Sequence, residues 1–302
     1  MKFWVGIIDD DVFIQLSRLK PEELNFWQPA LTPPRHMDPG TLFLFKLHAP
    51  NNYIVGGGYF VRFSALPCFL AWQAFGNKNG VNSLQDLVQA MTHDRHSRQN
   101  SGSKIGCNII NEPFFFPEED WVPIQENWNP NLRGLTYDTT EQYGEQLWEY
   151  VQAKITQKKD VVVTEEAKVD GEEYLNQARL GQGAFQIMVT DAYHRRCAVT
   201  NEKTLPALEA AHIRPSGNKG PHRTNNGLLL RADIHRLFNN GYVTLDPNLH
   251  FLVSERVREQ FENGREYYRF HGVELQNLPD SINDQPSREF IKWHNEKCFE
   301  RI

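Results

Sequence analysis

Three polar residues between Cys197 and Gly241 are of the types that hydrolyse an ester bond with the help of a metal ion. They are His212, Asn226 and His235, spaced 14 and 9 residues apart. A neutral histidine can take a proton from water near pH 7, because its unperturbed pKa lies close to that pH. A second histidine can hold a divalent cation, which stabilises negative charge on a phosphate. The stretch therefore contains the residue types needed to cleave a phosphodiester.

The local sequence patterns place each of these residues on a different element. His212 lies near the end of an apolar run, Leu208–Ile213, that predicts a strand. Asn226 lies in a loop rich in Gly, Pro and Asn. His235 lies within Leu228–Phe238, whose apolar residues have helical spacing. A strand histidine, a loop asparagine and a helix histidine in this order are the layout of a ββα-metal nuclease site.

The segment from about Arg179 to Ile302 resembles the HNH endonuclease family. The motifs LEAAHI, NNGLLL and DIHRLFNNG carry the resemblance, and the flanking RLGQGAFQIMVTDAYHRRCAVTN and KWHNEKCF fit the same branch. Carried over position by position, it implies that His212 is the general base, that Asn226 braces it and that His235 is a metal ligand. It also implies Mg²⁺ or Mn²⁺ as the cofactor and double-stranded DNA as the substrate.

Two positions depart from the common HNH pattern. Many family members have Asp or His directly before the base, where this chain has Ala211. Glu209, earlier on the same strand, could replace that ligand or could be a surface carboxylate. Many members also have a carboxylate or His one helical turn after the ligand histidine, where this chain has Asn239, a weaker oxygen donor. We therefore expect a metal site of His235 with Glu209 or Asn239, completed by water and phosphate.

Basic residues are concentrated around this site. The whole chain has a net charge of −6, yet residues 194–236 contain eight Lys or Arg and three Asp or Glu. Arg214, Lys219 and Arg223 follow the base and are candidates for binding DNA phosphates, with solvated loop charges as the alternative. His222, in the same loop, is interpreted as an incidental histidine that could touch phosphate.

The first half of the chain alternates short apolar runs with turn residues, which suggests a small, partly closed β-barrel with flanking helices. The expected strands are Phe3–Ile8, Thr41–Leu47, Tyr53–Phe63 and Lys104–Ile110, and the expected helices are Ser83–Thr92 and Thr139–Ile155. The segment Thr156–Glu173 is charged and has no aromatic residue, so it is the expected linker.

The sequence MDPGTLFLFKLHAPNNYIVGGGYFVRFSALP, with the later strand IGCNIINEPFFF, resembles the PUA-like superfamily. That superfamily includes the ASCH, EVE and SRA-type readers of modified bases. The resemblance implies a pocket in which a flipped base stacks between aromatic side chains. The candidates for this pocket, each of which could instead be an ordinary core residue, are Trp27, Tyr59, Phe60, Trp72, Trp121 and Trp128.

These features predict an α+β chain with two domains. A PUA-like β-barrel is expected at residues 1–155, a linker at 156–173 and an HNH ββα-metal domain at 174–302. The last domain should also contain strands at Tyr242–Leu245, His250–Val253 and Tyr267–Phe270 and a helix at Pro286–Phe299.

The composition predicts a cytoplasmic protein without membrane contact. No apolar run approaches the length of a membrane helix, and the N-terminal residues lack the features of a signal peptide. The four cysteines form no CxxC pair, which disfavours structural zinc and favours reduced thiols.

Together the two resemblances predict a modification-dependent restriction endonuclease that recognises modified cytosine and protects its host against phage. Cutting both DNA strands with one site per chain would require a homodimer. Two alternatives stay open. Ala211 and Asn239 could mark a decayed site in a non-catalytic nucleic-acid-binding protein. The chain could also be an HNH effector nuclease whose N-terminal domain senses a nucleotide or a protein.

Overall fold

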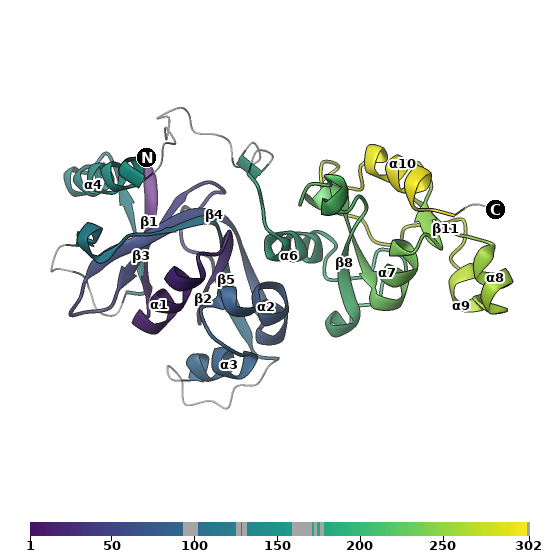
Figure 1. Cartoon of the computed structure of the whole chain (residues 1–302), viewed down its shortest axis with the longest axis horizontal. Helices are drawn as coiled ribbons and strands as arrows, with labels where there is room; N and C mark the ends of the chain where they lie inside the picture. The colour runs from purple at the N-terminus through teal and green to yellow at the C-terminus, as the bar shows by residue number, and fades with distance from the viewer. Residues whose placement is uncertain are drawn as a thin grey trace. The chain divides into compact units, whose positions relative to one another are not determined.

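The computed structural model describes residues 1–92, 102–124, 128, 132–158, 171, 174–175 and 178–300. The chain divides into two compact units, Met1–Ala178 and Arg179–Ile302, and each is described by itself (Figure 1). Most of the expected linker, residues 156–173, lies outside the described residues. The domain limits expected at residues 155 and 174 therefore stay predictions.

A mixed sheet forms the centre of the first unit. Its strands follow the order β2-β5-β4-β3-β1-β7, and β6 pairs with β4. β1 and β3 are parallel, whereas the other pairs are antiparallel. The strands are β1 (Lys2–Ile8), β2 (Glu23–Gln28), β3 (Leu42–Leu47), β4 (Tyr53–Pro67), β5 (Lys104–Phe115), β6 (Val122–Pro123) and β7 (Gly134–Asp138). In the described part of the chain β2 and β7 end this order without pairing with each other, so the expected barrel is not closed.

The glycine run Gly56–Gly58 lets β4 lie against its neighbours. A Cβ atom on Gly57 would lie only 2.6 Å from the carbonyl oxygen of Phe43 in β3. The pairing of β4 with β5 also shifts register between Gly57 and Tyr59. Glycine is thus required where the strand is bulged and closely packed on both sides.

Helices pack on the sheet and enclose two apolar clusters. Leu44 belongs to the cluster that includes Val151 of α4, whereas Phe43 and Phe45 belong to the cluster that includes Phe13 of α1. This division follows from the alternation of side chains along β3. The helices are α1 (Asp10–Leu19), α2 (Cys68–Phe75), α3 (Leu84–Thr92) and α4 (Gln142–Lys158), of which α3 and α4 confirm the two helices expected here.

In the second unit, β8 (Leu208–His212), β9 (Gly227–Arg231) and α7 (Ala232–Asn239) form a ββα unit. β8 and β9 are antiparallel, with His212 opposite Gly227 and Glu209 opposite Leu230. The helix expected from Leu228 begins only at Ala232, so the first part of that expectation is wrong. The three leucines at 228–230 are each 1% exposed, and such a continuous buried run fits a strand covered on both faces.

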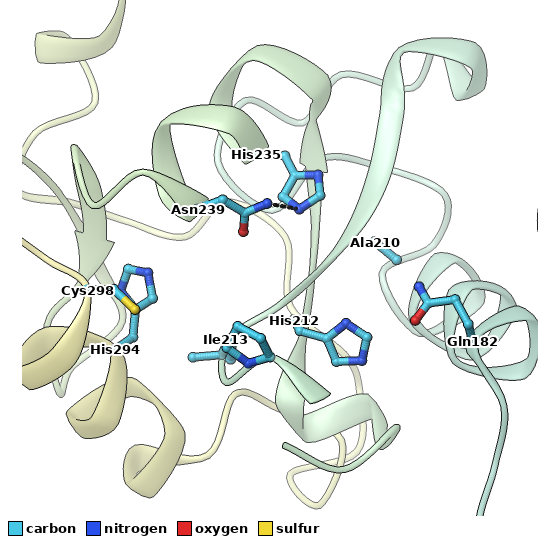
Figure 2. A pocket seen from close by; sticks show the side chains of 9 residues that line it. Gln182, Ala210, His212, Ile213, His235, Asn239, His294 and Cys298 are labelled. Carbon is cyan, nitrogen blue, oxygen red and sulfur yellow. Dashed lines mark hydrogen bonds between the residues drawn. The ribbon is translucent and has the colours of Figure 1, made fainter. Parts of the chain in front are cut away.

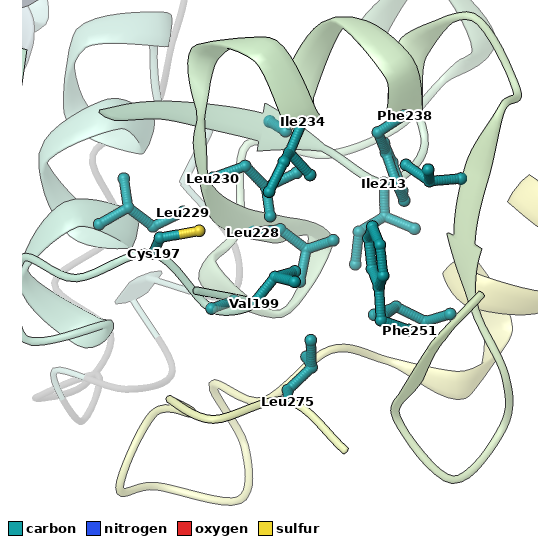
Figure 3. Close-up of a cluster of buried hydrophobic side chains, with 14 of the residues drawn as sticks. Cys197, Val199, Ile213, Leu228, Leu229, Leu230, Ile234, Phe238, Phe251 and Leu275 are labelled. Atoms are coloured by element: carbon teal, nitrogen blue, oxygen red, sulfur yellow. The ribbon is translucent and has the colours of Figure 1, made fainter. Parts of the chain in front are cut away.

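The remaining helices and strands surround the ββα unit, and all of them except β12 contribute to one apolar cluster, part of which is drawn in Figure 3. They are α6 (Gln182–Ala192), β10 (Val243–Leu245), β11 (His250–Val253), α8 (Arg256–Phe261), α9 (Arg265–Tyr268), β12 (Val273–Glu274) and α10 (Arg288–Lys297). The expected strand at Tyr267–Phe270 is wrong, because Arg265–Tyr268 is a helix that begins after Gly264 at a φ of +110°. A short aromatic run is compatible with a strand or a helix, and here the turn at Gly264 starts a helix.

No helix in the described part of the chain has the length and apolarity needed to cross a bilayer. All four cysteines are free thiols; Cys68, Cys107 and Cys197 are buried and Cys298 is partly exposed.

Candidate active site

A cavity of about 260 Å³ lies beside the ββα unit (Figure 2). Its lining residues are Gln182, Ala210, His212, Ile213, Pro215, His235, Asn239, His294 and Cys298. The structure therefore brings the predicted base, His212, to the same cavity as two predicted metal ligands, His235 and Asn239. Asn226 does not line the cavity and is completely buried.

His212 is fixed by two ring neighbours. The ring of Phe185, in α6, stacks on it with centroids 3.7 Å apart and an interplanar angle of 11°. Its Nε2 atom lies 3.0 Å from Nδ1 of His222. Burial, and secondarily the neighbouring His222 and His235, lowers the pKa of His212 to about 4. His212 is therefore neutral at pH 7, the form that accepts a proton from water.

Asn226 closes the loop that follows His212. Its Oδ1 accepts from the backbone N–H of Arg214 at 2.9 Å. Its Nδ2 donates to the carbonyl oxygens of Arg214 and Pro221, at 2.9 and 2.8 Å. Both ends of the loop are thus tied to one buried amide, and no aliphatic side chain could make these bonds.

His235 lies between two polar partners. Its Nδ1 lies 2.6 Å from Oε2 of Glu209, and its Nε2 lies 2.9 Å from Nδ2 of Asn239. The carboxylate of Glu209 can only accept, so Nδ1 of His235 donates to it and Nε2 is the nitrogen left to bind a cation. Figure 2 shows the contact between Asn239 and His235 as a dashed line. Glu209 therefore orients the ring of His235.

Ala211, which stands where many HNH proteins have a metal ligand, is fully buried in the apolar cluster of this unit. This position packs against the core instead of facing the cavity. The carboxylate of Glu209 does not replace the ligand that is missing at Ala211, because it contacts His235. The departure at Ala211 is thus explained by core packing.

The donor set for a cation is small. Among the described residues there is no group of three or more His, Cys, Asp or Glu side chains that could hold a metal ion. What remains is Nε2 of His235 and the amide of Asn239, whose Oδ1 would have to rotate toward the ion because Nδ2 now faces the ring. Imidazole nitrogen and amide oxygen are acceptable donors for Mn²⁺ or Mg²⁺ when water and phosphate oxygens complete the shell.

Residues 197–246 match the HNH endonuclease family. The match contains His212, Asn226 and His235 and spans the ββα unit. This segment is an HNH endonuclease domain. The family expected from the sequence motifs is confirmed for this segment, and an HNH endonuclease domain supports nuclease activity of the chain.

No curated protein matches the chain. Among solved structures, two mutants of ZmASCH from Zymomonas mobilis match with TM-scores of 0.35 and 0.33 and 10% identity; each match covers 49% of this chain, and 97% and 94% of those chains. A modification-dependent restriction endonuclease, TagI, matches with a TM-score of 0.28 and 14% identity, over 97% of this chain and 81% of that chain.

The basic residues that follow His212 differ in exposure. Lys219 and Arg223 are exposed. Arg214 is half-buried: its Nε donates to the carbonyl oxygen of Asn218 at 2.8 Å, and its guanidinium lies 5.7 Å from the ring centroid of Trp293. A phosphate contact by Arg214 would compete with these contacts. The backbone of Lys219 has a left-handed conformation, with a φ of +63°.

Sequence patterns do not single out two residues that contact His212. Phe185 has no motif that marks it, and the sequence favours an incidental role for His222. The stacking partner of His212 comes from a helix outside the matched segment, so no local spacing indicates it. The sequence feature that could have indicated a role for His222 is its position in the loop between His212 and Asn226.

The six aromatic candidates for a base pocket in the first unit do not form one group. Phe60 is 3% exposed inside an apolar cluster, and Trp121 packs between both clusters. Trp27 donates from Nε1 to the carbonyl oxygen of Asn79, and Trp72 lies in α2. Tyr59 lies 6.5 Å from Tyr174 between ring centroids, and Trp128 lies under the ammonium of Lys46. Their role in base binding stays a prediction.

Proposed function

We propose that this chain is a metal-dependent DNA endonuclease in which His212 is the general base. The observation that carries the proposal is the shared cavity: a neutral, ring-stacked histidine and the donor pair His235–Asn239 line one space within an HNH domain. A phosphodiester that enters this cavity would meet a base on one side and a cation site on the other.

His235, with Asn239, would hold a divalent ion of the Mg²⁺ or Mn²⁺ class. Such an ion, when bound, would stabilise charge on the scissile phosphate and on the leaving oxygen. Glu209 serves this site indirectly by fixing the ring of His235 through Nδ1. The sequence offered Glu209 as a direct ligand, and the observed contact favours this orienting role.

The chain's own residues divide the remaining tasks. His212 removes a proton from the attacking water, and Phe185 keeps its ring plane fixed while it does so. Asn226 holds both ends of the loop, which keeps Lys219 and Arg223 beside the site for contact with DNA phosphates. The main role of Arg214 is to stabilise the loop, and phosphate binding is its lesser role.

We further propose that the first unit reads modified cytosine and that the enzyme cuts as a homodimer in the cytoplasm, where it would restrict phage DNA. The support for the reader is the resemblance of residues 37–67 to PUA-like proteins. The support for the dimer is chemical: one site per chain breaks one strand, so a double-strand break needs two chains.

Plasmid cleavage tests this function. Matched DNAs carrying cytosine, methylcytosine, hydroxymethylcytosine and glucosylated hydroxymethylcytosine are incubated with Mg²⁺, with Mn²⁺ or with chelator. We expect metal-dependent cutting of one modified DNA, and a loss of about 10²–10⁴-fold in rate for His212→Ala, with DNA binding retained. His250→Ala, which changes a histidine outside the cavity, is the control. Full cutting by His212→Ala would disprove the assignment of the base.

A second candidate is a non-catalytic DNA-binding protein. The small donor set favours it, since the described residues provide no cluster of three charged or imidazole ligands. Absence of cleavage on every DNA in both metals, with binding intact, would support this candidate over the nuclease.

A further inference from the structure

We infer that His222 is a positioning residue that fixes the proton of His212 on Nε2 and leaves Nδ1 as the basic nitrogen. This inference rests on the proposed function of His212. The two imidazoles meet with Nε2 of His212 3.0 Å from Nδ1 of His222, and their rings are nearly perpendicular, at 68°. A nitrogen engaged in this contact is not available to a water molecule, so the contact decides which atom acts as the base.

The position of His222 follows from the loop that carries it. Asn226 binds the carbonyl oxygen of Pro221, the residue directly before His222. The same amide binds both backbone groups of Arg214, two residues after His212. One buried side chain therefore sets the distance between the two histidines, which explains why a loop residue can hold a fixed ring contact.

Phe185 completes the enclosure of the histidine pair. Its ring is completely buried, stacks on His212 and lies 5.8 Å from His222 between centroids. The stack fixes the plane of the His212 ring but provides no hydrogen-bond partner to either nitrogen. A 180° turn of the His212 ring about its Cβ–Cγ bond would preserve the stack, so the contact with His222 decides which ring nitrogen faces the loop.

The hydrogen bond between these two imidazoles has two possible directions. If His222 donated from Nδ1, the Nε2 lone pair of His212 would be consumed and its proton would lie on Nδ1, so neither nitrogen could act as a base. If His222 accepts, its own proton lies on Nε2, and His212 has a free lone pair on Nδ1. When His212 takes a proton from water, the resulting cation keeps its Nε2–H bond to His222. Only the accepting state of His222 is compatible with a catalytic His212.

The test compares two replacements of similar size in the full-length protein. Asn places an oxygen near the position of Nδ1 and can accept from Nε2–H, whereas Leu cannot. We expect His222→Leu to lower kcat by at least about tenfold, a part of the 10²–10⁴-fold effect of general-base catalysis, with KM for DNA unchanged. His222→Asn should recover most of that loss. His250→Asn, outside the cavity, should be unaffected.

A second measurement does not depend on activity. Nitrogen NMR of the imidazole rings in the metal-free protein should show the proton of His212 on Nε2, and His222→Leu should release this preference. A proton on Nδ1 of His212 in the wild type, or equal kcat for the Leu and Asn variants, would overturn the role of His222. If the wild type cuts no DNA but the NMR result holds, the proposed function fails and the positioning contact stands.

Discussion

At the scale of single residues, the proposed cation site depends on a histidine, His235, whose two nitrogens have different partners. Glu209 fixes the proton of His235 on Nδ1, and Asn239 occupies the face of Nε2. A carboxylate that orients a ligand imidazole commonly affects metal affinity by about 10–100-fold. An amide at a ligand position contributes no charge, which leaves the site weaker than one with a carboxylate.

Two substitutions should therefore shift metal affinity in opposite directions. We expect Glu209→Gln to weaken Mn²⁺ binding by about 10–100-fold, because a neutral amide holds the Nδ1–H group of His235, and so the orientation of its ring, less firmly than a carboxylate. Asn239→Asp should strengthen binding, because an anionic oxygen then faces the cation. Titration calorimetry of the metal-free protein measures both constants.

His212→Asn serves as the matched control, since it alters the cavity without touching either partner of His235. Equal Mn²⁺ affinity in Glu209→Gln and the wild type would show that Glu209 is only a surface carboxylate. Weaker binding by Asn239→Asp would show that this position does not face the ion.

At the scale of elements, a buried histidine of α10 bonds directly to the end of α7. His294 is 2% exposed; its Nε2 donates to the carbonyl oxygen of Phe238 at 3.1 Å, and Nδ1 lies 2.8 Å from Oγ1 of Thr244. Its ring also stacks on Phe238 at 3.8 Å. Burial lowers the pKa of His294 to about 4, although the bond to the Phe238 carbonyl acts in the opposite direction.

This depressed pKa predicts acid sensitivity of the second unit. Between the unfolded pKa of about 6.5 and the folded value, the unfolded chain binds a proton at this site and the folded chain does not. The contribution to stability is therefore complete above about pH 6.5 and is lost as the pH falls toward 4, by about 1–3 kcal/mol. Denaturant unfolding at several pH values measures the slope.

His294→Gln is the matched variant, because its amide can still donate to the Phe238 carbonyl but does not titrate. We expect lower stability at pH 7, from the lost ring stack, and a shallower dependence on pH between 6.5 and 4. An unchanged slope would mean that His294 does not control the acid response. His212, whose pKa is also lowered, should contribute equally in both proteins.

The family pattern predicted the ββα layout of this unit better than local periodicity predicted its elements. Residue types and spacing singled out His212, Asn226 and His235 as candidates, and their roles stay predictions. The pattern failed for the three leucines before Arg231, because a buried strand and a buried helix are both continuously apolar. The sequence alone suggests that Ala211 replaces a lost ligand, whereas the structure shows that it is buried. The contact between His212 and His222 depends on the closure of a loop, which hydrophobic periodicity does not predict.

At the scale of the whole molecule, the charge is distributed unevenly along a chain of two units. Residues 194–236 carry a local excess of basic side chains, although the net charge of the chain is −6. Each compact unit has its own apolar core; that of the second contains Phe185, Phe238 and Ile291. DNA attraction is thus concentrated in the nuclease unit, while the acidic remainder opposes non-specific binding.

Residues 179–302 should therefore fold and cut without the first unit, but with a different selectivity. We expect a cooperative unfolding transition, metal-dependent nicking of unmodified plasmid, and equal rates on modified and unmodified DNA. Salt should reduce this activity steeply, because the remaining attraction is to phosphates. The same truncated unit with His212→Ala is the control for contaminating nucleases. A preserved preference for modified DNA would place the reader in the nuclease unit, and a truncated unit that folds but does not cut would show that the first unit contributes to the cleavage step as well.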